Sequence, residues 1–270
     1  MALRLAWVGR VGEGALLLTL ASCAPAPGPV PVSIPNPTPP PVIALPAASP
    51  PVLVAPRRPP VALCERGTVA PGVDGRLLNH FPYPEMPATA LVPAPAALGD
   101  ESCRVHPAML NDLNRLIAAA DADPAVRGQL RAVSCRRSVA FQAQTFCAGI
   151  LSGRSRGFAD RAWASAPPGH SEHATGYAID FGTRDRRGCP DADACFAATA
   201  MGKWLLANAS RYGFELSFPA GNQQRVKWEP WHWRWVGADA SAPGAEAARR
   251  TFATARSRFP ARPGIQGGPR

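Results

Sequence analysis

Near its N-terminus the sequence has no apolar run long enough to cross a bilayer, because the stretch that begins at residue 15 ends at residue 20. A transmembrane helix needs about 20 consecutive apolar residues. The chain also lacks a Cys-x-x-Cys pair, which weighs against a structural zinc site built on thiolates. No internal repeat is visible, so we expect one medium-sized domain within the 270 residues.

Negative charge and lysine are both scarce. The chain has 19 acidic residues against 29 Lys and Arg, a formal net charge of +10 and a pI near 10.0. Its only lysines are Lys203 and Lys227, so arginine supplies nearly all of the positive charge. This balance favours an anionic partner, which could be nucleic acid, lipid head groups or cell wall.

The first 22 residues are typical of a signal peptide. Arg4 and Arg10 precede the apolar run, and Ala21-Ser22-Cys23 follows it. This ending resembles a bacterial lipobox, which implies cleavage before Cys23 and lipid attachment there; the alternative is an ordinary secretory signal with a chance cysteine. We expect an exported protein, lipid-anchored to the bacterial envelope and facing the periplasm. That location makes nucleic acid an unexpected partner, and no obligate protein partner is inferred.

Export to an oxidising compartment makes disulfides the expected state of the six cysteines after Cys23. Neighbours along the chain are the simplest partners. We therefore predict the pairs Cys64–Cys103, Cys135–Cys147 and Cys189–Cys195. A zinc–thiolate cluster is the rival interpretation.

The composition divides the chain after the signal peptide into three parts. Residues 23–61 begin at the lipidated cysteine and are dominated by Pro, Ala and Val, which favours a stiff, extended tether. Residues 62–237 are expected to form the folded domain. Residues 238–270 are rich in Ala, Arg, Pro and Gly with little periodic apolar pattern, which predicts a low-order basic tail that is largely disordered or weakly helical.

Within the domain, apolar periodicity predicts helices and short strands in irregular order. The helices are expected from His106-Pro107 onward, over 140–150 and over 196–212, where Gly213 would end the last one. The strands are expected over 130–133, 177–181, 214–218 and 231–236. This order favours an α+β fold with a small, mainly antiparallel sheet and flanking helices.

Two distant segments carry side chains suited to a metal-dependent hydrolase. His173 and Asp180 flank a strand-like stretch, and His232 follows Glu229 in a Glu-x-x-His pair. Two imidazoles and one carboxylate satisfy the protein-ligand count of a catalytic zinc, which keeps one position open for water. A nearby carboxylate that does not bind the metal can act as the general base, and Glu229 is the candidate. The donor set is not unique to zinc, so another divalent metal remains an alternative.

The motif Ser171-x-His173-x-x-Gly176-x-Ala178-x-Asp180, with the downstream Glu-x-x-His, resembles the VanY-type D-alanyl-D-alanine carboxypeptidase family of zinc peptidases. The resemblance implies a fold like that of hedgehog proteins and D,D-peptidases. It also implies two histidines and one aspartate as zinc ligands, glutamate as catalytic base, and a substrate-binding role for Ser171. The alternative for Ser171 is a turn hydroxyl.

A third segment supports the resemblance. Family members carry a Ser-Gly-Tyr-Arg-Ser-like stretch followed by a glutamine, and the matching residues here are 134–138 with Gln142. The resemblance implies that Arg137 holds the substrate's terminal carboxylate, with Gln142 also in the substrate site. Cys135 and Arg136 depart from the family pattern, which leaves Arg136 as a second candidate for the carboxylate.

The expected function is a zinc metallopeptidase that acts on peptidoglycan stem peptides and releases a terminal D-alanine. Two alternatives remain open at this point. One is a peptidoglycan endopeptidase of the same fold, and the other is a non-catalytic, zinc-containing wall-binding lipoprotein. An intact Glu229 favours an enzyme, because a purely structural metal site needs no base.

Overall fold

In the computed structural model, the described residues are Gly28 and 58–265. The predicted signal peptide, the predicted lipidation site at Cys23 and nearly all of the predicted tether lie outside them. Within the described residues, no helix combines the length and the apolar character that a membrane span requires.

The central sheet has four antiparallel strands, which confirms the predicted α+β class. They are β5 (Leu130–Ser134), β6 (Ala178–Thr183), β7 (Phe214–Leu216) and β8 (His232–Trp235). Their order across the sheet is β5-β6-β8-β7, so β6 and β8 lie in the middle. All four overlap the strands that were expected from the apolar pattern.

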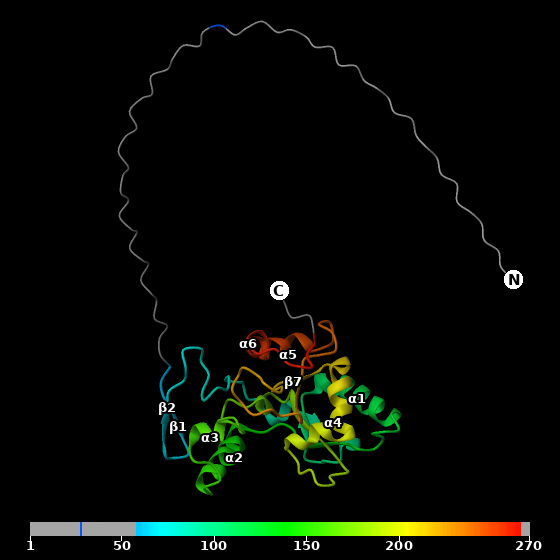
Figure 1. Cartoon of the computed structure of the whole chain (residues 1–270), viewed down its shortest axis with the longest axis horizontal. Helices are drawn as coiled ribbons and strands as arrows, with labels where there is room; N and C mark the ends of the chain where they lie inside the picture. Colours follow the sequence, from blue (N-terminus) through cyan, green and yellow to red (C-terminus); the bar gives the residue numbers. More distant parts are fainter. Residues whose placement is uncertain (1–27, 29–57, 266–270) are drawn as a thin grey trace, which may run out of the picture. The chain divides into compact units, whose positions relative to one another are not determined.

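The described chain also contains two small ribbons and six α-helices, besides short 3-10 turns. The ribbons pair β1 (Val61–Leu63) with β2 (Gly67–Val69) and β3 (Val92–Pro93) with β4 (Arg104–Val105). The first four helices are α1 (Leu110–Ala122), α2 (Val139–Leu151), α3 (Phe158–Ala162) and α4 (Ala200–Asn208). In Figure 1, α2 and α3 lie near the β1–β2 ribbon, whereas α1 and α4 lie toward the other end of the sheet.

The helix predicted over 196–212 is three shorter pieces. A 3-10 turn (Ala194–Ala198) precedes α4, and another (Ala209–Tyr212) follows it. The break falls at Thr199, whose extended backbone and side-chain oxygen cap the first turn of α4 by accepting a hydrogen bond from the Gly202 amide. The segment still ends at Gly213, as predicted, in a left-handed conformation.

The central strands present two different faces. Ile179, Phe181, Trp233 and Trp235 are buried in the main hydrophobic core. Because successive strand residues point to opposite faces, Asp180 and His232 lie on the other face. The alternating tryptophans therefore serve core packing, and the sheet offers its second face to polar side chains.

The tail that was predicted to be largely disordered or weakly helical contains two helices that pack on the core. Two helices, α5 (Ala245–Thr251) and α6 (Ala253–Arg258), follow β8, and they are visible beside the sheet in Figure 1. Ala245, Ala248, Phe252 and Ala255 recur at helical spacing and are buried in the main core. Small alanines let these helices approach closely, yet they give a weak apolar signal in the sequence. Farther on, the Leu216 amide of β7 donates to the Pro263 carbonyl at 3.0 Å.

The disulfide pairing also differs from the prediction. The bonds are Cys64–Cys147, Cys103–Cys135 and Cys189–Cys195, so only the third pair is confirmed. Cys64 follows β1 and Cys147 lies on α2, which ties the first ribbon to that helix. Sequence neighbours failed as a guide for the other four cysteines because their partners are brought together by tertiary packing.

Candidate metal centre

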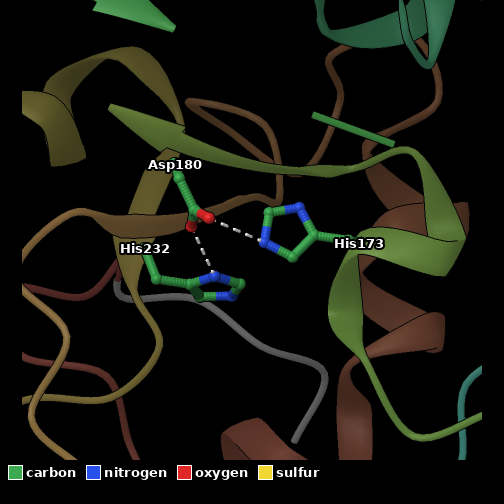
Figure 2. Close-up of side chains that lie close together, drawn as sticks. All are labelled: His173, Asp180 and His232. Carbon is green, nitrogen blue, oxygen red and sulfur yellow. Dashed lines mark hydrogen bonds and ion pairs between the residues drawn. The ribbon is translucent and has the colours of Figure 1, made fainter. Parts of the chain in front are cut away.

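The three predicted metal ligands converge at one end of the central strands. His173 lies on a 3-10 turn (Glu172–Thr175), Asp180 on β6 and His232 on β8. Asp180 and His232 are directly paired across the two central strands. Figure 2 shows both imidazoles directed at the Asp180 carboxylate.

The geometry of this group suits a metal ion. His173 Nε2 lies 3.2 Å from Asp180 Oδ2, and His232 Nδ1 lies 2.9 Å from Asp180 Oδ1. All three residues are buried, and their ligand atoms lie within 4.8 Å of one another. In the described part of the chain the group has these three members, which is the protein-ligand count of metal sites that keep a position open.

Hydrogen bonds on the far side of each ring orient the ligand nitrogens. His173 Nδ1 lies 2.7 Å from the Cys135 carbonyl oxygen and donates to it. His232 Nε2 lies 3.0 Å from Glu172 Oε2 and donates to that carboxylate. Each bond leaves the other nitrogen, Nε2 of His173 and Nδ1 of His232, directed at the shared site.

Gly176 lies between the turn that carries His173 and strand β6, which carries Asp180. It ends the 3-10 turn with a φ of 72°, in the left-handed region. A Cβ at this position would lie 2.6 Å from Leu91 Cδ2, so a side chain is excluded by contact as well as by conformation. Gly176 thus provides the sharp turn between His173 and β6.

The charges of the group favour a bound cation. Burial opposes ionisation of Asp180, but the two imidazoles hold the pKa of its carboxyl well below the usual range. Burial likewise disfavours a charged His232, yet Asp180 and Glu172 raise its pKa to about 10. Burial lowers the pKa of His173, which keeps its imidazole neutral and able to bind a metal. Asp180 and Glu172 thus stabilise positive charge on the His232 ring, and a cation bound among the ligands would supply that charge in place of the ring proton.

A β-bulge in the edge strand β5 directs the segment that follows it, residues 134–138, toward the metal ligands. Ala132 pairs with Phe181 and Ser134 with Asp180, so Val133 is the extra residue. The shift places Ser134 beside Asp180 and brings the Cys135 carbonyl to His173. Cys135, which departs from the family pattern, is thus fixed twice, by its disulfide to Cys103 and by the hydrogen bond from His173.

Replacing both Cys103 and Cys135 with serine should lower the free energy of unfolding by about 2–5 kcal/mol. Their sequence separation of 32 residues makes the unfolded chain gain much freedom once the cross-link is lost. Urea denaturation of the metal-free proteins measures the change. The Cys189–Cys195 pair closes a separation of only 6 residues and should cost less when replaced, so an equal loss in both double variants would contradict the expectation.

A cavity of about 240 Å³ opens onto the metal ligands. Glu229, Arg137 and Ser171 all line it, together with His170 and Lys227. The Lys227 Nζ also lies 5.0 Å from the centre of the Trp231 ring. The cavity thus combines the Glu229 carboxylate with three cationic side chains, Arg137, Arg161 and Lys227, beside the candidate metal site.

Glu229 has the properties expected of a proton acceptor. Burial, together with the negative charge of Asp180, raises the pKa of its carboxyl to about 7, although His232 opposes the shift. Its side chain makes no hydrogen bond or ion pair with another described residue, and its backbone carbonyl accepts from the His232 amide at 3.0 Å. The carboxylate is therefore unengaged beside the metal ligands and can exchange protons near neutral pH.

Arg137 is held in the cavity by its neighbours. Its Nη1 donates to Gln142 Oε1 at 2.9 Å, and its Nη2 donates to Ser134 Oγ at 3.2 Å. Arg136, the second candidate, instead pairs with Glu85 at 2.6 Å. Of the two arginines, Arg137 is the one that lines the cavity.

Gln142 and Ser171 occupy different positions relative to the cavity. Gln142 is almost fully buried, and its amide nitrogen donates to the Ala166 carbonyl at 2.6 Å, so its side chain supports Arg137 and has no free group for a substrate. Ser171 makes no capping hydrogen bond at the turn that it precedes, and it lines the cavity. The turn-hydroxyl alternative for Ser171 therefore has no support.

Two residues that contribute to this site were assigned no role from the sequence patterns. Glu172 supports His232, and the only signal for it was its place between Ser171 and His173. His80, more than 80 residues upstream, lines the cavity and donates from Nε2 to the Ala162 carbonyl at 2.7 Å. Neither contact follows from local sequence, because both depend on tertiary packing.

Lowering the pH from 7 to 5 should destabilise the wild-type chain by about 2 kcal/mol more than a His80→Asn variant. Burial lowers the pKa of His80 from 6.5 to about 4, so between these values the unfolded chain binds a proton that the folded chain does not. The stability contributed by neutral His80 is complete above pH 6.5 and is lost as the pH falls toward 4. Urea denaturation of both metal-free proteins at the two pH values measures the difference, and parallel pH profiles would contradict it.

Comparison with known proteins gives a consistent result. A family model described as VanY, D-alanyl-D-alanine carboxypeptidase, matches residues 102–238. The protein YodJ of Bacillus subtilis (strain 168) is 41% identical over 80 residues, 29% of this chain and 29% of YodJ. A D-alanyl-D-alanine carboxypeptidase of Enterococcus faecium is 35% identical over 78 residues, 28% of this chain and 23% of that relative.

Among solved structures, the LdcB LD-carboxypeptidase is similar with a TM-score of 0.51 and 27% identity, over 64% of this chain and 81% of that chain. The alignments with the two curated relatives span less than a third of the length of each. The family match includes the candidate ligands, Glu229 and Arg137, but it ends before α5 and α6.

Proposed function

Because the chain belongs to the VanY D-alanyl-D-alanine carboxypeptidase family, we propose that it is a zinc-dependent carboxypeptidase that removes a terminal D-alanine from peptidoglycan stem peptides. The observation that carries the proposal is the convergence of two imidazoles and one carboxylate beside a cavity that also contains Glu229 and Arg137. Each of these groups has a part in hydrolysis of a terminal peptide bond.

His173, Asp180 and His232 would hold the zinc ion through Nε2, a carboxylate oxygen and Nδ1. When bound there, zinc supplies Lewis-acid activation of a water molecule and of the scissile carbonyl. The hydrogen bonds from His173 to Cys135 and from His232 to Glu172 keep the two rings in the orientation that this binding requires.

Glu229 is proposed to take the proton from the attacking water and to deliver it to the leaving amine. A pKa near 7 suits both steps, because the carboxyl group can accept and release a proton at neutral pH. Arg137 is proposed to bind the terminal carboxylate of the substrate, since guanidinium binds carboxylates through paired hydrogen bonds. Gln142 and Ser134 accept hydrogen bonds from Nη1 and Nη2 and keep the guanidinium group fixed, and Nη2 also lies 3.8 Å from Asp180 Oδ2.

One alternative to D-alanyl-D-alanine cleavage is the reaction of an LD-carboxypeptidase, which a similar solved structure suggests. The LdcB structure is that of an LD-carboxypeptidase, whereas the family model and the Enterococcus faecium relative are described as D-alanyl-D-alanine carboxypeptidases. Both reactions release a C-terminal residue, and a carboxylate clamp at Arg137 suits both. An endopeptidase would cut an internal bond, which offers no free carboxylate beside the cleavage point.

The proposal is tested by incubating the zinc-loaded protein with defined stem pentapeptides and tetrapeptides and identifying the products by mass spectrometry. Loss of one D-alanine from the pentapeptide supports the proposal, whereas loss from the tetrapeptide alone indicates the L,D reaction. Internal fragments would indicate an endopeptidase. Zinc binding without any cleavage would leave the non-catalytic wall-binding lipoprotein as the interpretation.

The proposed place of action is the bacterial envelope, with a lipid on Cys23 as the membrane anchor. The signal-like residues 1–22, the Pro-rich stretch after them and the net charge of +10 support this proposal. Metabolic labelling with a fatty-acid analogue, compared between the wild-type chain and Cys23→Ala, tests the anchor. Equal labelling of the two proteins would contradict it.

A further inference from the structure

Glu172 is a buried carboxylate beside the metal ligands, with all of its contacts made inside the protein. Its Oε2 accepts from His232 Nε2 at 3.0 Å and from Ser217 Oγ at 2.5 Å. Its Oε1 accepts from Arg234 Nη1 at 2.9 Å and from the Tyr83 hydroxyl at 3.2 Å. Only 1% of its side chain is exposed, so Glu172 acts through His232 rather than on a substrate.

The charges continue from Glu172 along the sheet toward the C-terminal helices. Arg234 lies two residues after His232 on β8 and pairs across the strands with Glu215 of β7. Its Nε donates to Glu215 Oε2 at 3.2 Å. Glu215 in turn accepts from Nη2 and Nε of Arg256 on α6, at 2.9 and 3.0 Å. Glu172, Arg234, Glu215 and Arg256 thus form a charge chain of alternating sign that ends at the metal ligand His232.

The C-terminal segment completes this chain in two further ways. Phe252, at the junction of α5 and α6, lies with its ring centre 5.4 Å from the guanidinium carbon of Arg234. The Ile265 amide donates to Glu215 Oε1 at 3.1 Å. These contributors all lie beyond residue 238, where the family match ends. The residues that the family model matches therefore supply Glu172, Arg234 and Glu215, whereas Arg256 lies beyond them.

We propose that Glu172 is a positioning residue for His232, and that the C-terminal helices secure it through Arg234, Glu215 and Arg256. This inference rests on the metal site of the proposed function. The hydrogen bond from Nε2 to Glu172 sets the plane of the His232 ring and leaves Nδ1 directed at the metal position. Arg256 keeps Glu215 in place, and Glu215 keeps Arg234 against Glu172.

Loss of one charge should disturb the others because they are buried. Arg234 has 1% side-chain exposure and Glu215 has 3%, so neither can turn to solvent for compensation. Without Arg256, Glu215 would lose the hydrogen bonds from that guanidinium group, and Arg234 would move toward Glu215. A buried ion pair that loses one partner leaves an uncompensated charge, which the surrounding groups must accommodate. The consequence is a looser hydrogen bond between Glu172 and His232.

The test measures zinc affinity by chelator competition on the purified full chain. Glu172→Gln should weaken zinc binding by about 10- to 100-fold, the range found for partners of metal ligands. Arg256→Met keeps the aliphatic stem but removes the charge, and we expect it to weaken zinc binding by at least about threefold, below that range because it acts at a distance. Arg256→Lys should recover most of the affinity. The double variant Glu172→Gln/Arg256→Met should lose less than the product of the two separate losses, because the two changes act on one chain.

Arg250→Met is the matched control, because Arg250 lies on α5 with 68% of its side chain exposed and, among the described residues, pairs only with Glu246. It should bind zinc as the wild type does. Thermal melting of the zinc-free proteins, with the visible spectrum of the cobalt-substituted forms, separates a change at the metal from a general loss of stability. If Glu172→Gln does not fold, the comparison of Arg256→Met with Arg256→Lys decides the question.

The outcomes distinguish this inference from the proposed function. If the wild-type chain binds zinc, and Glu172→Gln and Arg256→Met bind it with the same affinity, the inference is overturned. The peptidase proposal would then remain intact. A lower melting temperature in Arg256→Met without a change in zinc affinity would also overturn it. A wild-type chain that binds no zinc would overturn the proposed function together with this inference.

Discussion

Replacing Glu229 with glutamine should lower kcat for stem-peptide hydrolysis by about 10²- to 10⁴-fold, which is the usual contribution of a positioned general base. Glutamine has nearly the same shape as glutamate but cannot accept the proton of the attacking water. Because Glu229 is not among the three candidate ligands, zinc affinity should remain close to that of the wild type. Steady-state kinetics and chelator competition on the same preparations measure the two quantities.

Glu246→Gln is the control for this substitution, since Glu246 lies on α5 with 78% of its side chain exposed. It makes the same chemical change far from the cavity and should leave kcat unaltered. A Glu229→Gln variant with wild-type kcat would show that another group takes the proton. A variant that instead loses zinc would place Glu229 among the ligands.

Replacing Asp180 with asparagine should weaken zinc binding by more than about 100-fold, because loss of an outer partner of a ligand alone costs about 10- to 100-fold. Asp180 lies between both histidines and contributes the only carboxylate of the three-member group in the described chain. Asparagine keeps the size and one oxygen but removes the negative charge that a divalent cation needs. Chelator competition measures the affinity, and activity at limiting zinc should fall in parallel.

Asp191→Asn provides the matched control. Asp191 forms ion pairs with Arg131 and Arg186 away from the metal ligands, and 30% of its side chain is exposed. Its replacement should leave zinc affinity unchanged. Equal affinities in the wild type and Asp180→Asn would remove Asp180 from the ligand set and would count against the proposed metal site.

Sequence patterns predicted the parts of the fold that depend on short-range periodicity. The four strands of the sheet were found because β-branched and aromatic residues alternate or cluster over a few positions. The candidate ligands were found because two imidazoles, a carboxylate and a glutamate recur in a spacing that resembles a known family. The sheet explains that spacing, since Asp180 and His232, 52 residues apart, are opposite each other on the central strands.

The features that were not predicted depend on contacts between distant segments. Cys135 pairs with Cys103, and not with the nearer Cys147, because the β-bulge and the β3–β4 ribbon meet beside His173. The role of the buried Glu172 depends on Arg234, which lies 62 residues farther along the chain, on β8. The C-terminal segment was predicted only as a low-order tail, disordered or weakly helical, because alanine contributes little apolar area per residue, although its spacing is helical.

The hydrogen bond between the Leu216 amide and the Pro263 carbonyl affects whether two copies of this protein can pair through β7. β7 is an outer strand of the sheet, and outer strands offer free backbone groups to which a second molecule can add its own strand. Here the end of the described chain takes up the amide of Leu216, and proline carries no amide proton with which to extend the ladder. The C-terminal segment therefore also protects the sheet against intermolecular pairing and aggregation.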